Sequence, residues 1–451
     1  MKEIFSFIER RKEAYLAELF DFIRCAGVSC SGENMRQAAQ HLCGILRRSG
    51  AKRVQILPTS GFPVVYAECI TDERLPTMLI YGHYDVQSAS DLEKWASNPF
   101  SPEIRDGRIY GRGAADNKAQ LFAHIKGREA YAAVKGNLPV NVKYLFEGEE
   151  EIGSPSLRSF VAENCELLRC DVCYYSDGGY HDSGLPILIL GVKGSFYAEI
   201  TLQGCKQETH AMRAPCLPNP AWRMVDLLAS VHMPGGRIAI KGFYDAVRPP
   251  SAEQRAAARK IPVNSAALKE SYGIARFLGK GDGSDYYERL IFEPAVNLCG
   301  IQGGYTGPGF RNIIPRSVTA RLDVSLVPKQ EPADIFSKLR RHLDEKGFAD
   351  ASLQMIGGAF IPARMSLDSA YVKAARQAVL DGFGVEPIIF PGVGGAGPND
   401  VFLTTLGVPT IGIPYANADQ NNHSSDENIL LDSFWKGIAA SAALIGKLAE
   451  R

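Results

Sequence analysis

Histidine and carboxylate residues stand directly after several apolar stretches of this sequence. His83 and Asp85 follow the apolar stretch 79–82. In an extended chain, two side chains at this spacing point the same way. An aspartate in that position can hold an imidazole ring from behind while the ring binds a metal ion. One histidine beside one aspartate is more often an ordinary hydrogen bond, so this pair alone does not establish a metal site.

Acidic residues and a second histidine follow three further apolar stretches. They are the acidic run 147–151 after the stretch 140–146, Asp177 after 171–175, and His423 shortly beyond 409–413. Because open α/β sheets bind ligands at the carboxyl ends of their strands, we expect these side chains along one edge of one sheet. Asp116, just before a helix predicted over 118–134, could join them or could be a plain helix cap.

Two imidazoles and several carboxylates are ligands that suit zinc and similar divalent ions. A carboxylate has two oxygens, so it can bridge two such ions. A pair of ions can activate a water molecule and polarise a carbonyl. A carboxylate that binds no metal must then accept the proton of that water. Glu150 and Glu151 are adjacent and project in different directions, so they can divide metal binding and proton acceptance between them.

The pattern of the elements that carry these residues divides the chain. Between about residues 191 and 358, strand-like and helical stretches alternate, and none ends in a comparable acid or histidine. This change of pattern predicts a separate α+β domain inserted into the first. We therefore predict an α/β fold, with a mostly parallel-sheet domain formed by residues 1–192 and 359–451 and an inserted α+β domain formed by residues 193–358.

The composition excludes several functional classes. The 451 residues are 45% hydrophobic and 22% charged, which is typical of a soluble globular protein. Fifty basic residues balance fifty acidic ones, so the chain offers no electrostatic footprint for nucleic acid or an anionic membrane. No apolar run is long enough to span a bilayer. We expect a cytoplasmic protein whose ten scattered cysteines are reduced thiols, with no metal or redox role for the Cys170 and Cys173 pair.

Five motifs resemble those of the M20 metallopeptidases, a family that includes carnosinase-like dipeptidases, desuccinylases and aminoacylases. In the family's order and spacing, they are Gly-His-Tyr-Asp-Val-Gln at 82–87, Gly-Arg-Gly-Ala-Ala-Asp-Asn-Lys at 111–118, Glu-Glu-Ile-Gly-Ser at 150–154, Ser-Asp at 176–177 and His-Ser-Ser-Asp-Glu at 423–427. The resemblance covers essentially the whole chain. It implies a zinc-peptidase-like catalytic domain in which the inserted α+β domain serves as a lid and for dimerisation.

The same resemblance implies two divalent metal ions per chain, zinc first, with manganese or cobalt as alternatives. His83 and Asp177 would hold one ion, Glu151 and His423 the other, and Asp116 would bridge them.

The resemblance also implies the reaction, which is hydrolysis of a dipeptide, an N-acyl amino acid or a related small amide, and it assigns roles in it to three more residues. Asp85 would orient His83, and Glu150 would be the general base. His210 would stabilise the oxyanion, contributed across a homodimer from the inserted domain.

Substrate contacts are implied for Asn219 and for Gly395, Ala396 and Gly397, which stand in a variant of the family's Gly-Gly-Ser-Ile-Pro loop. Ser325 occupies the place of an arginine expected to bind the substrate's carboxylate. We therefore predict that this chain depends less on a free carboxylate beside the scissile amide, unless an arginine from the preceding loop, Arg311 or Arg316, replaces the missing contact.

Two other functions can be argued from the sequence. The stretch 392–397 has the form G-x-G-x-x-G after the strand-like stretch 387–390, with Asp419 about twenty residues on, as in a dinucleotide site. Two prolines flank the glycines, and little chain remains for the helix that such a unit needs. The other alternative is a binding protein of the same fold that has lost its activity, which nothing in the sequence favours.

Overall fold

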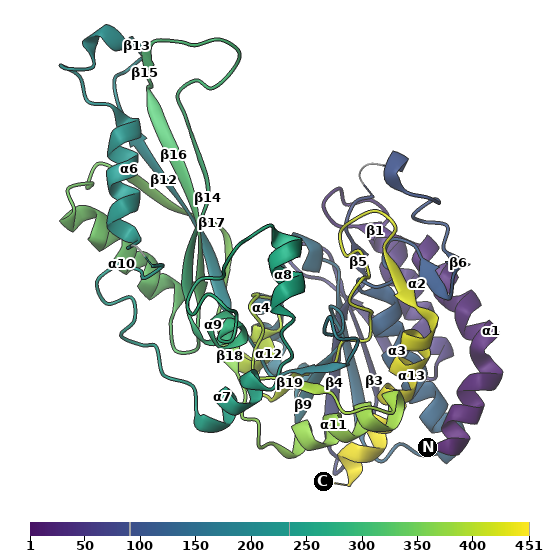
Figure 1. Cartoon of the computed structure of the whole chain (residues 1–451). Helices are drawn as coiled ribbons and strands as arrows, with labels where there is room; N and C mark the ends of the chain where they lie inside the picture. The colour runs from purple at the N-terminus through teal and green to yellow at the C-terminus, as the bar shows by residue number, and fades with distance from the viewer. Residues whose placement is uncertain (90–91, 234, 451) are drawn as a thin grey trace. The chain divides into compact units, whose positions relative to one another are not determined.

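The computed structural model describes residues 1–89, 92–233 and 235–450 (Figure 1). These residues form two compact units. Unit 1 comprises Met1–Gly191, Arg364–Pro391 and Pro398–Arg451, and unit 2 comprises Val192–Ala363 and Gly392–Gly397. The short strands β11 (Gly191–Val192) and β18 (Ala363–Arg364) pair where the chain passes from one unit to the other.

The central sheet of unit 1 has eight strands and is mostly parallel, which confirms the predicted α/β class. In spatial order, its strands are β19 (Ile388–Phe390), β10 (Ile187–Ile189), β20 (Thr410–Gly412), β9 (Val172–Tyr175), β4 (Thr77–His83), β8 (Asn141–Glu147), β3 (Val64–Cys69) and β2 (Arg53–Leu57). The neighbours β20, β9, β4 and β8 all run parallel, whereas the pairs β8–β3 and β3–β2 on one side and β20–β10 on the other are antiparallel.

The central strands are largely apolar because helices cover both faces of the sheet. Along β4, Met78 and Ile80 enter one hydrophobic cluster, and Leu79 and Tyr81 enter another. The larger cluster packs against α1 (Lys2–Arg24), α2 (Met35–Arg48), α3 (Lys118–Lys135), α11 (Ala370–Phe383) and α13 (Leu431–Ala449). The smaller one packs against α4 (Leu157–Glu163), α5 (Cys165–Leu168) and α12 (Asp400–Thr404).

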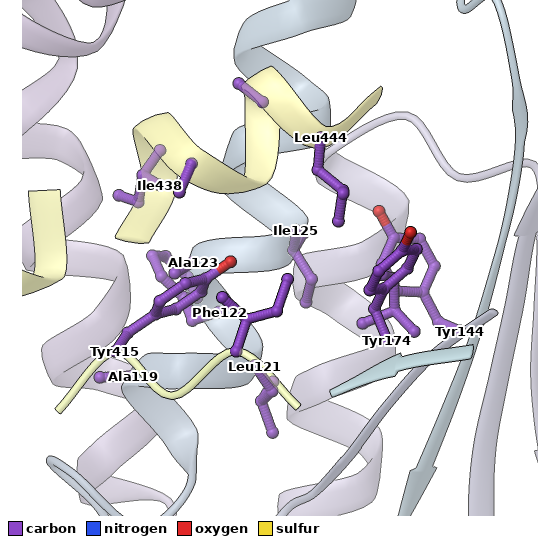
Figure 2. Packing of buried hydrophobic residues seen from close by; sticks show 14 of the residues in the cluster. Ala119, Leu121, Phe122, Ala123, Ile125, Tyr144, Tyr174, Tyr415, Ile438 and Leu444 are labelled. Carbon is purple, nitrogen blue, oxygen red and sulfur yellow. The ribbon is translucent and has the colours of Figure 1, made fainter. Parts of the chain in front are cut away.

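Helix α3 begins directly after the segment that carries Asp116, so its packing fixes that segment. Figure 2 shows Phe122 and Ile125 of α3 gathered with Ile438 and Leu444 of α13, and all four are fully buried. Burying such a side chain stabilises the fold by about 1.5–3 kcal/mol, so this helix pair anchors the segment that precedes α3 firmly.

Unit 1 also contains short elements outside its central sheet. They are β1 (Gly27–Val28), β5 (Asp85–Val86), β6 (Glu103–Arg105), β7 (Arg108–Tyr110), β21 (Asn428–Leu430) and the 3-10 helices η1 (Leu92–Lys94) and η2 (Glu150–Ile152). Strand β21 pairs antiparallel with β7, and β1 pairs parallel with β5.

Unit 2 is built on a four-stranded antiparallel sheet in the order β14 (Ala295–Gly303), β16 (Ser317–Leu326), β12 (Gly194–Gln203), β17 (Ser352–Phe360). Strands β12 and β16 alternate buried and more exposed residues, and the buried side packs against α6 (Pro220–Val231) and α10 (Pro332–Glu345). The remaining elements are β13 (Thr209–His210), β15 (Ile313–Ile314), η3 (Ala211–Arg213), α7 (Ala252–Arg259), α8 (Ser265–Tyr272) and α9 (Tyr286–Phe292). Among the described residues of both units, no helix combines the length and the apolar character needed to cross a membrane.

Candidate metal centre

Three adjacent parallel strands bring acids and a histidine to one edge of the sheet in unit 1. His83 is the last residue of β4 and is paired in register with Glu147, the last residue of β8. Asp177 follows the end of β9 by two residues, and Glu150 and Glu151 stand in η2 just beyond β8. Because these strands run parallel, their carboxyl ends share an edge, and the side chains that follow them meet there.

Asp116 lies between two histidines and presents one oxygen to each. Its Oδ1 is 2.9 Å from Nε2 of His83, and its Oδ2 is 3.1 Å from Nε2 of His423. Oε2 of Glu151 lies 3.0 Å from the same His423 nitrogen, and Oδ2 of Asp177 lies 3.7 Å from the His83 nitrogen. Donor atoms of His83, Asp116 and Glu151 all lie within 4.8 Å of one another. The five side chains thus form two donor groups that share Asp116.

Asp85 holds the back of the His83 ring and also the turn that carries Glu151. Nδ1 of His83 lies 3.2 Å from the backbone oxygen of Asp85 and 3.3 Å from its Oδ1, and Oδ2 of Asp85 accepts a hydrogen bond of 3.1 Å from the backbone N–H of Glu151. Both Asp85 and His83 are fully buried. With Nδ1 facing Asp85, the lone pair of Nε2 is directed toward Asp116 and is available to a metal ion.

Gln87 also holds Glu151, although the sequence pattern assigned it no role. Its backbone N–H donates to Oε1 of Glu151 at 3.1 Å, and its side-chain Nε2 donates to the backbone oxygen of Glu151 at 3.2 Å. The signal was present in the motif at 82–87, because Gln87 stands two residues after Asp85 in an extended segment.

The site holds more negative than positive charge. Burial and the nearby Asp116 carboxylate raise the pKa of Asp177 to about 7. Burial also raises the pKa of Glu150, and the charges of Asp177, Asp116 and Glu151 add to this, while His83 opposes it. Hydrogen bonds to Asp116 and Glu151 raise the pKa of His423 to about 10. Carboxylates crowded in this way favour the binding of a proton or a cation, and the mixed nitrogen and oxygen donors fit divalent metal ions.

The side chains that the sequence pattern assigned to substrate lie in unit 2. His210 is exposed, and its Nδ1 accepts a hydrogen bond of 3.1 Å from the N–H of Met212. Asn219 caps helix α6 through a 2.9 Å hydrogen bond from the N–H of Ala221. A part in substrate binding or catalysis stays a prediction for both residues.

The other four predicted substrate residues also belong to unit 2. Ser325 on β16 is half-buried and faces away from the core of the unit, between Ser195 of β12 and Ala295 of β14. In the segment 392–397, the backbone oxygen of Gly395 accepts a 2.9 Å hydrogen bond from the N–H of Lys193, and Ala396 and Gly397 complete the segment.

The glycine-rich stretch 392–397 lacks the surroundings of a dinucleotide site. The helix that follows it, α12, has only five residues. A phosphate-binding unit needs a longer helix whose N-terminus faces the phosphates. The dinucleotide alternative therefore has no support.

The chain matches the family model described as peptidase family M20/M25/M40 over residues 79–447. It is 28% identical over 408 residues to the Beta-Ala-His dipeptidase of Rattus norvegicus, covering 88% of this chain and 81% of that protein. It is also 28% identical over 400 residues to the Cys-Gly metallodipeptidase dug1 of Schizosaccharomyces pombe, covering 86% and 83%.

A solved structure agrees with these sequence matches. The M20 family metallo-carboxypeptidase Sso-CP2 from Sulfolobus solfataricus superposes with a TM-score of 0.90 at 33% identity, covering 97% of this chain and 99% of that one. The family model alone spans well over half of the chain. The chain belongs to peptidase family M20/M25/M40 and is a metal-dependent hydrolase of peptide bonds.

Proposed function

We propose that this protein is a dipeptidase-like amidohydrolase that works with two divalent metal ions per chain. Its substrate is a dipeptide, an N-acyl amino acid or a related small amide. The observation that carries the proposal is the position of Asp116, which presents one oxygen toward His83 and the other toward His423. A single carboxylate shared by two donor groups is the arrangement that a pair of metal ions requires. The names of the relatives, Beta-Ala-His dipeptidase and Cys-Gly metallodipeptidase, support a short peptide as substrate.

His83 and Asp177 would hold one ion, His423 and Glu151 the other, and Asp116 both. Zinc suits these ligands, and manganese and cobalt are alternatives. When bound, such ions supply an activated water molecule and polarise the scissile carbonyl. The direct experiment removes the ions with a chelator, which should abolish dipeptide hydrolysis, and restores hydrolysis with Zn²⁺, Mn²⁺ or Co²⁺.

Three polar residues beside the proposed ligands, Glu150, Asp85 and Gln87, transfer the proton or hold the ligands in position. Glu150 stands one residue before a proposed ligand and accepts the proton of the attacking water, then delivers it to the leaving amine. Nδ1 of His83 donates to the backbone oxygen of Asp85 at 3.2 Å, with the carboxylate of the same residue 3.3 Å away, which fixes the tautomer and leaves Nε2 for a metal. Gln87 and Asp85 together keep Glu151 in one orientation.

Ser325 is proposed to relax the need for a free substrate carboxylate. A serine offers one neutral hydrogen bond where an arginine would offer two charge-assisted ones. Arg321, on the same face of β16, does not replace it, because its Nε is bound 2.8 Å from Oε2 of Glu199. Asp323 stands between Ser325 and Arg321 and would repel a carboxylate.

We therefore expect a dipeptide and its C-terminal carboxamide to be hydrolysed with similar kcat/KM, and Ser325→Arg to favour the carboxylate form. Steady-state kinetics on such matched pairs measures both. A strong preference of the wild type for the carboxylate, unchanged in Ser325→Arg, would show that another residue binds that group.

We also propose a cytoplasmic homodimer formed through unit 2. Strand β14 is an edge of the sheet formed by the described residues, and Leu298 and Ile301 on it are exposed. On α6, Trp222 is 72% exposed and Val225 is exposed as well. An unpaired edge strand and large apolar side chains left in water favour a second copy of this chain as their partner.

His210 would act across this dimer, on the site of the other subunit, where it stabilises the oxyanion. Mixing inactive His210→Ala subunits with inactive Glu150→Gln subunits should then restore part of the activity, because one site in the mixed dimer is complete. Hydrolysis after subunit exchange, followed with labelled subunits, is the measurement. If the subunits exchange but hydrolysis does not recover, His210 acts on the site of its own chain or takes no part in the reaction.

A further inference from the structure

A fully buried carboxylate, that of Glu427, lies beneath the segment that carries Asp116. Its Oε1 accepts hydrogen bonds from the backbone N–H groups of Gly113, Ala115 and Asp116, at 3.1, 2.8 and 2.9 Å. Its Oε2 accepts from Nη1 of Arg112 at 2.7 Å and again from the N–H of Gly113 at 3.1 Å. All five contacts come from donors, and three of the four donor groups are backbone N–H groups, so the carboxylate determines the course of the chain up to Asp116.

Arg112 ties the same carboxylate to the segment of the second histidine. Its side chain is 2% exposed, and its Nη2 donates to the backbone oxygen of Ser424, the residue after His423, at 3.1 Å. The guanidinium carbon also lies 5.3 Å from the centroid of the Trp95 ring, a cation–π distance. Arg112 therefore bonds on one side to Glu427 and on the other to the turn that carries His423.

The backbone joins these two segments as well. The N–H of Gly111 donates to the backbone oxygen of Glu427 at 3.0 Å, and β7 pairs with β21 directly beside it. Glu427 stands four residues after His423, and Arg112 stands four residues before Asp116. The buried Arg112–Glu427 ion pair thus joins two segments that are over 300 residues apart in sequence. One segment carries Asp116 and the other carries His423, and these two side chains are in contact.

We infer that Arg112 and Glu427 are positioning residues for the metal centre, which set the distance between Asp116 and His423. The inference rests on the proposed function, since it assigns these two side chains to metal binding. Groups that hold metal ligands in place typically change metal affinity by about 10–100-fold when they are altered. The Glu427 carboxylate can have an effect of this size, because it accepts a hydrogen bond from the backbone N–H of Asp116. If the carboxylate moves, the backbone of this proposed ligand moves with it.

Glu427→Gln is the sharpest variant, since it preserves size and replaces one acceptor oxygen by an NH₂ group. Every neighbour of that carboxylate is a donor, so the amide has no acceptor to bond and must push residues 113–116 or Arg112 away. Arg112→Lys is the milder variant. It keeps the positive charge but loses the fork that reaches both Glu427 and Ser424.

Lys126→Met is the matched control. Lys126 is also buried in unit 1, on α3, where it pairs with Glu129 at 2.8 Å and with Glu18. It stands ten residues after Asp116 and bonds to none of the proposed ligands. Its loss tests whether breaking any buried ion pair in this unit is enough to weaken metal binding.

The experiment titrates metal-free wild type and the three variants with Co²⁺, by calorimetry and by the visible absorption of the bound ion, after circular dichroism has shown that each is folded. We expect two ions per wild-type chain, an affinity about 10–100-fold weaker in Glu427→Gln and Arg112→Lys with an altered absorption spectrum, and wild-type behaviour in Lys126→Met. If Glu427→Gln does not fold, the titration of Arg112→Lys decides between the two outcomes.

Unchanged affinity and spectrum in the folded variants, with two ions in the wild type, would overturn the positioning role and leave the proposed function intact. An equal loss in Lys126→Met would also overturn it, since any damage to the unit would then suffice. A wild type that binds no Co²⁺ would instead contradict the proposed function itself.

Discussion

Glu150→Gln is expected to lower kcat for dipeptide hydrolysis by at least about 10²–10⁴-fold while the protein keeps its metal ions. Glutamine has the shape of glutamate but cannot accept the proton of the attacking water. Glu150 stands in η2, where the charges of His83, Asp177 and Asp116 reach it. Steady-state kinetics combined with a metal determination on the same sample measures both parts of the expectation.

Glu151→Gln is the control, because the two residues are adjacent and differ in their contacts. Oε2 of Glu151 lies 3.0 Å from Nε2 of His423, and its Oε1 accepts from the N–H of Gln87. We expect this variant to lose metal from one site. An active Glu150→Gln and an inactive Glu151→Gln, both with metal retained, would show that the two roles are the reverse of those proposed.

Asp116→Ala is expected to remove both metal ions and with them all hydrolysis. The carboxylate presents one oxygen to each histidine, so its loss takes a ligand from each donor group. Alanine also leaves the backbone N–H of residue 116 bonded to Glu427, so the segment keeps its support. His83→Ala is the comparison, because it removes a ligand from one group only and should mainly empty one site.

Much of the fold could be predicted because the central strands are largely apolar. Strands buried on both faces read as continuous hydrophobic runs, and parallel strands end at the same edge. Those two facts were enough to expect His83, Glu151 and Asp177 together. The change of pattern between about residues 191 and 358, where no strand-like stretch ends in a comparable acid or histidine, likewise led us to predict an inserted α+β domain.

Other parts of the site could not be predicted from the pattern. Glu427 is a charged residue in a polar turn, which is normally a sign of a solvated surface. It is fully buried because the backbone of residues 113–116, distant in sequence, supplies its donors. Gln87 stands in the motif at 82–87, but the motif does not identify its partner Glu151, which comes from another strand end. Hydrogen bonds between loops depend on how the strands are ordered, which local sequence does not encode.

The surroundings of the segment Gly392–Gly397 could not be predicted from local sequence either. It stands in the sequence between two parts of unit 1, but it packs with unit 2, where Gly395 bonds to Lys193 and Gly394 lies against Leu290. Glycine has no side chain whose polarity would indicate how the segment packs. From the sequence alone, the stretch was therefore compatible with a dinucleotide site and with a substrate loop.

The central claim is that Asp116 joins two metal ions into one catalytic centre, and counting the ions per chain tests it most directly. Wild type and Asp116→Ala would be loaded with Zn²⁺, freed of excess metal, and measured by elemental analysis and by dipeptide hydrolysis. We predict two ions and full activity in the wild type, and neither ions nor hydrolysis in Asp116→Ala. Undiminished hydrolysis by a metal-free sample, or two ions retained in Asp116→Ala, would contradict the claim.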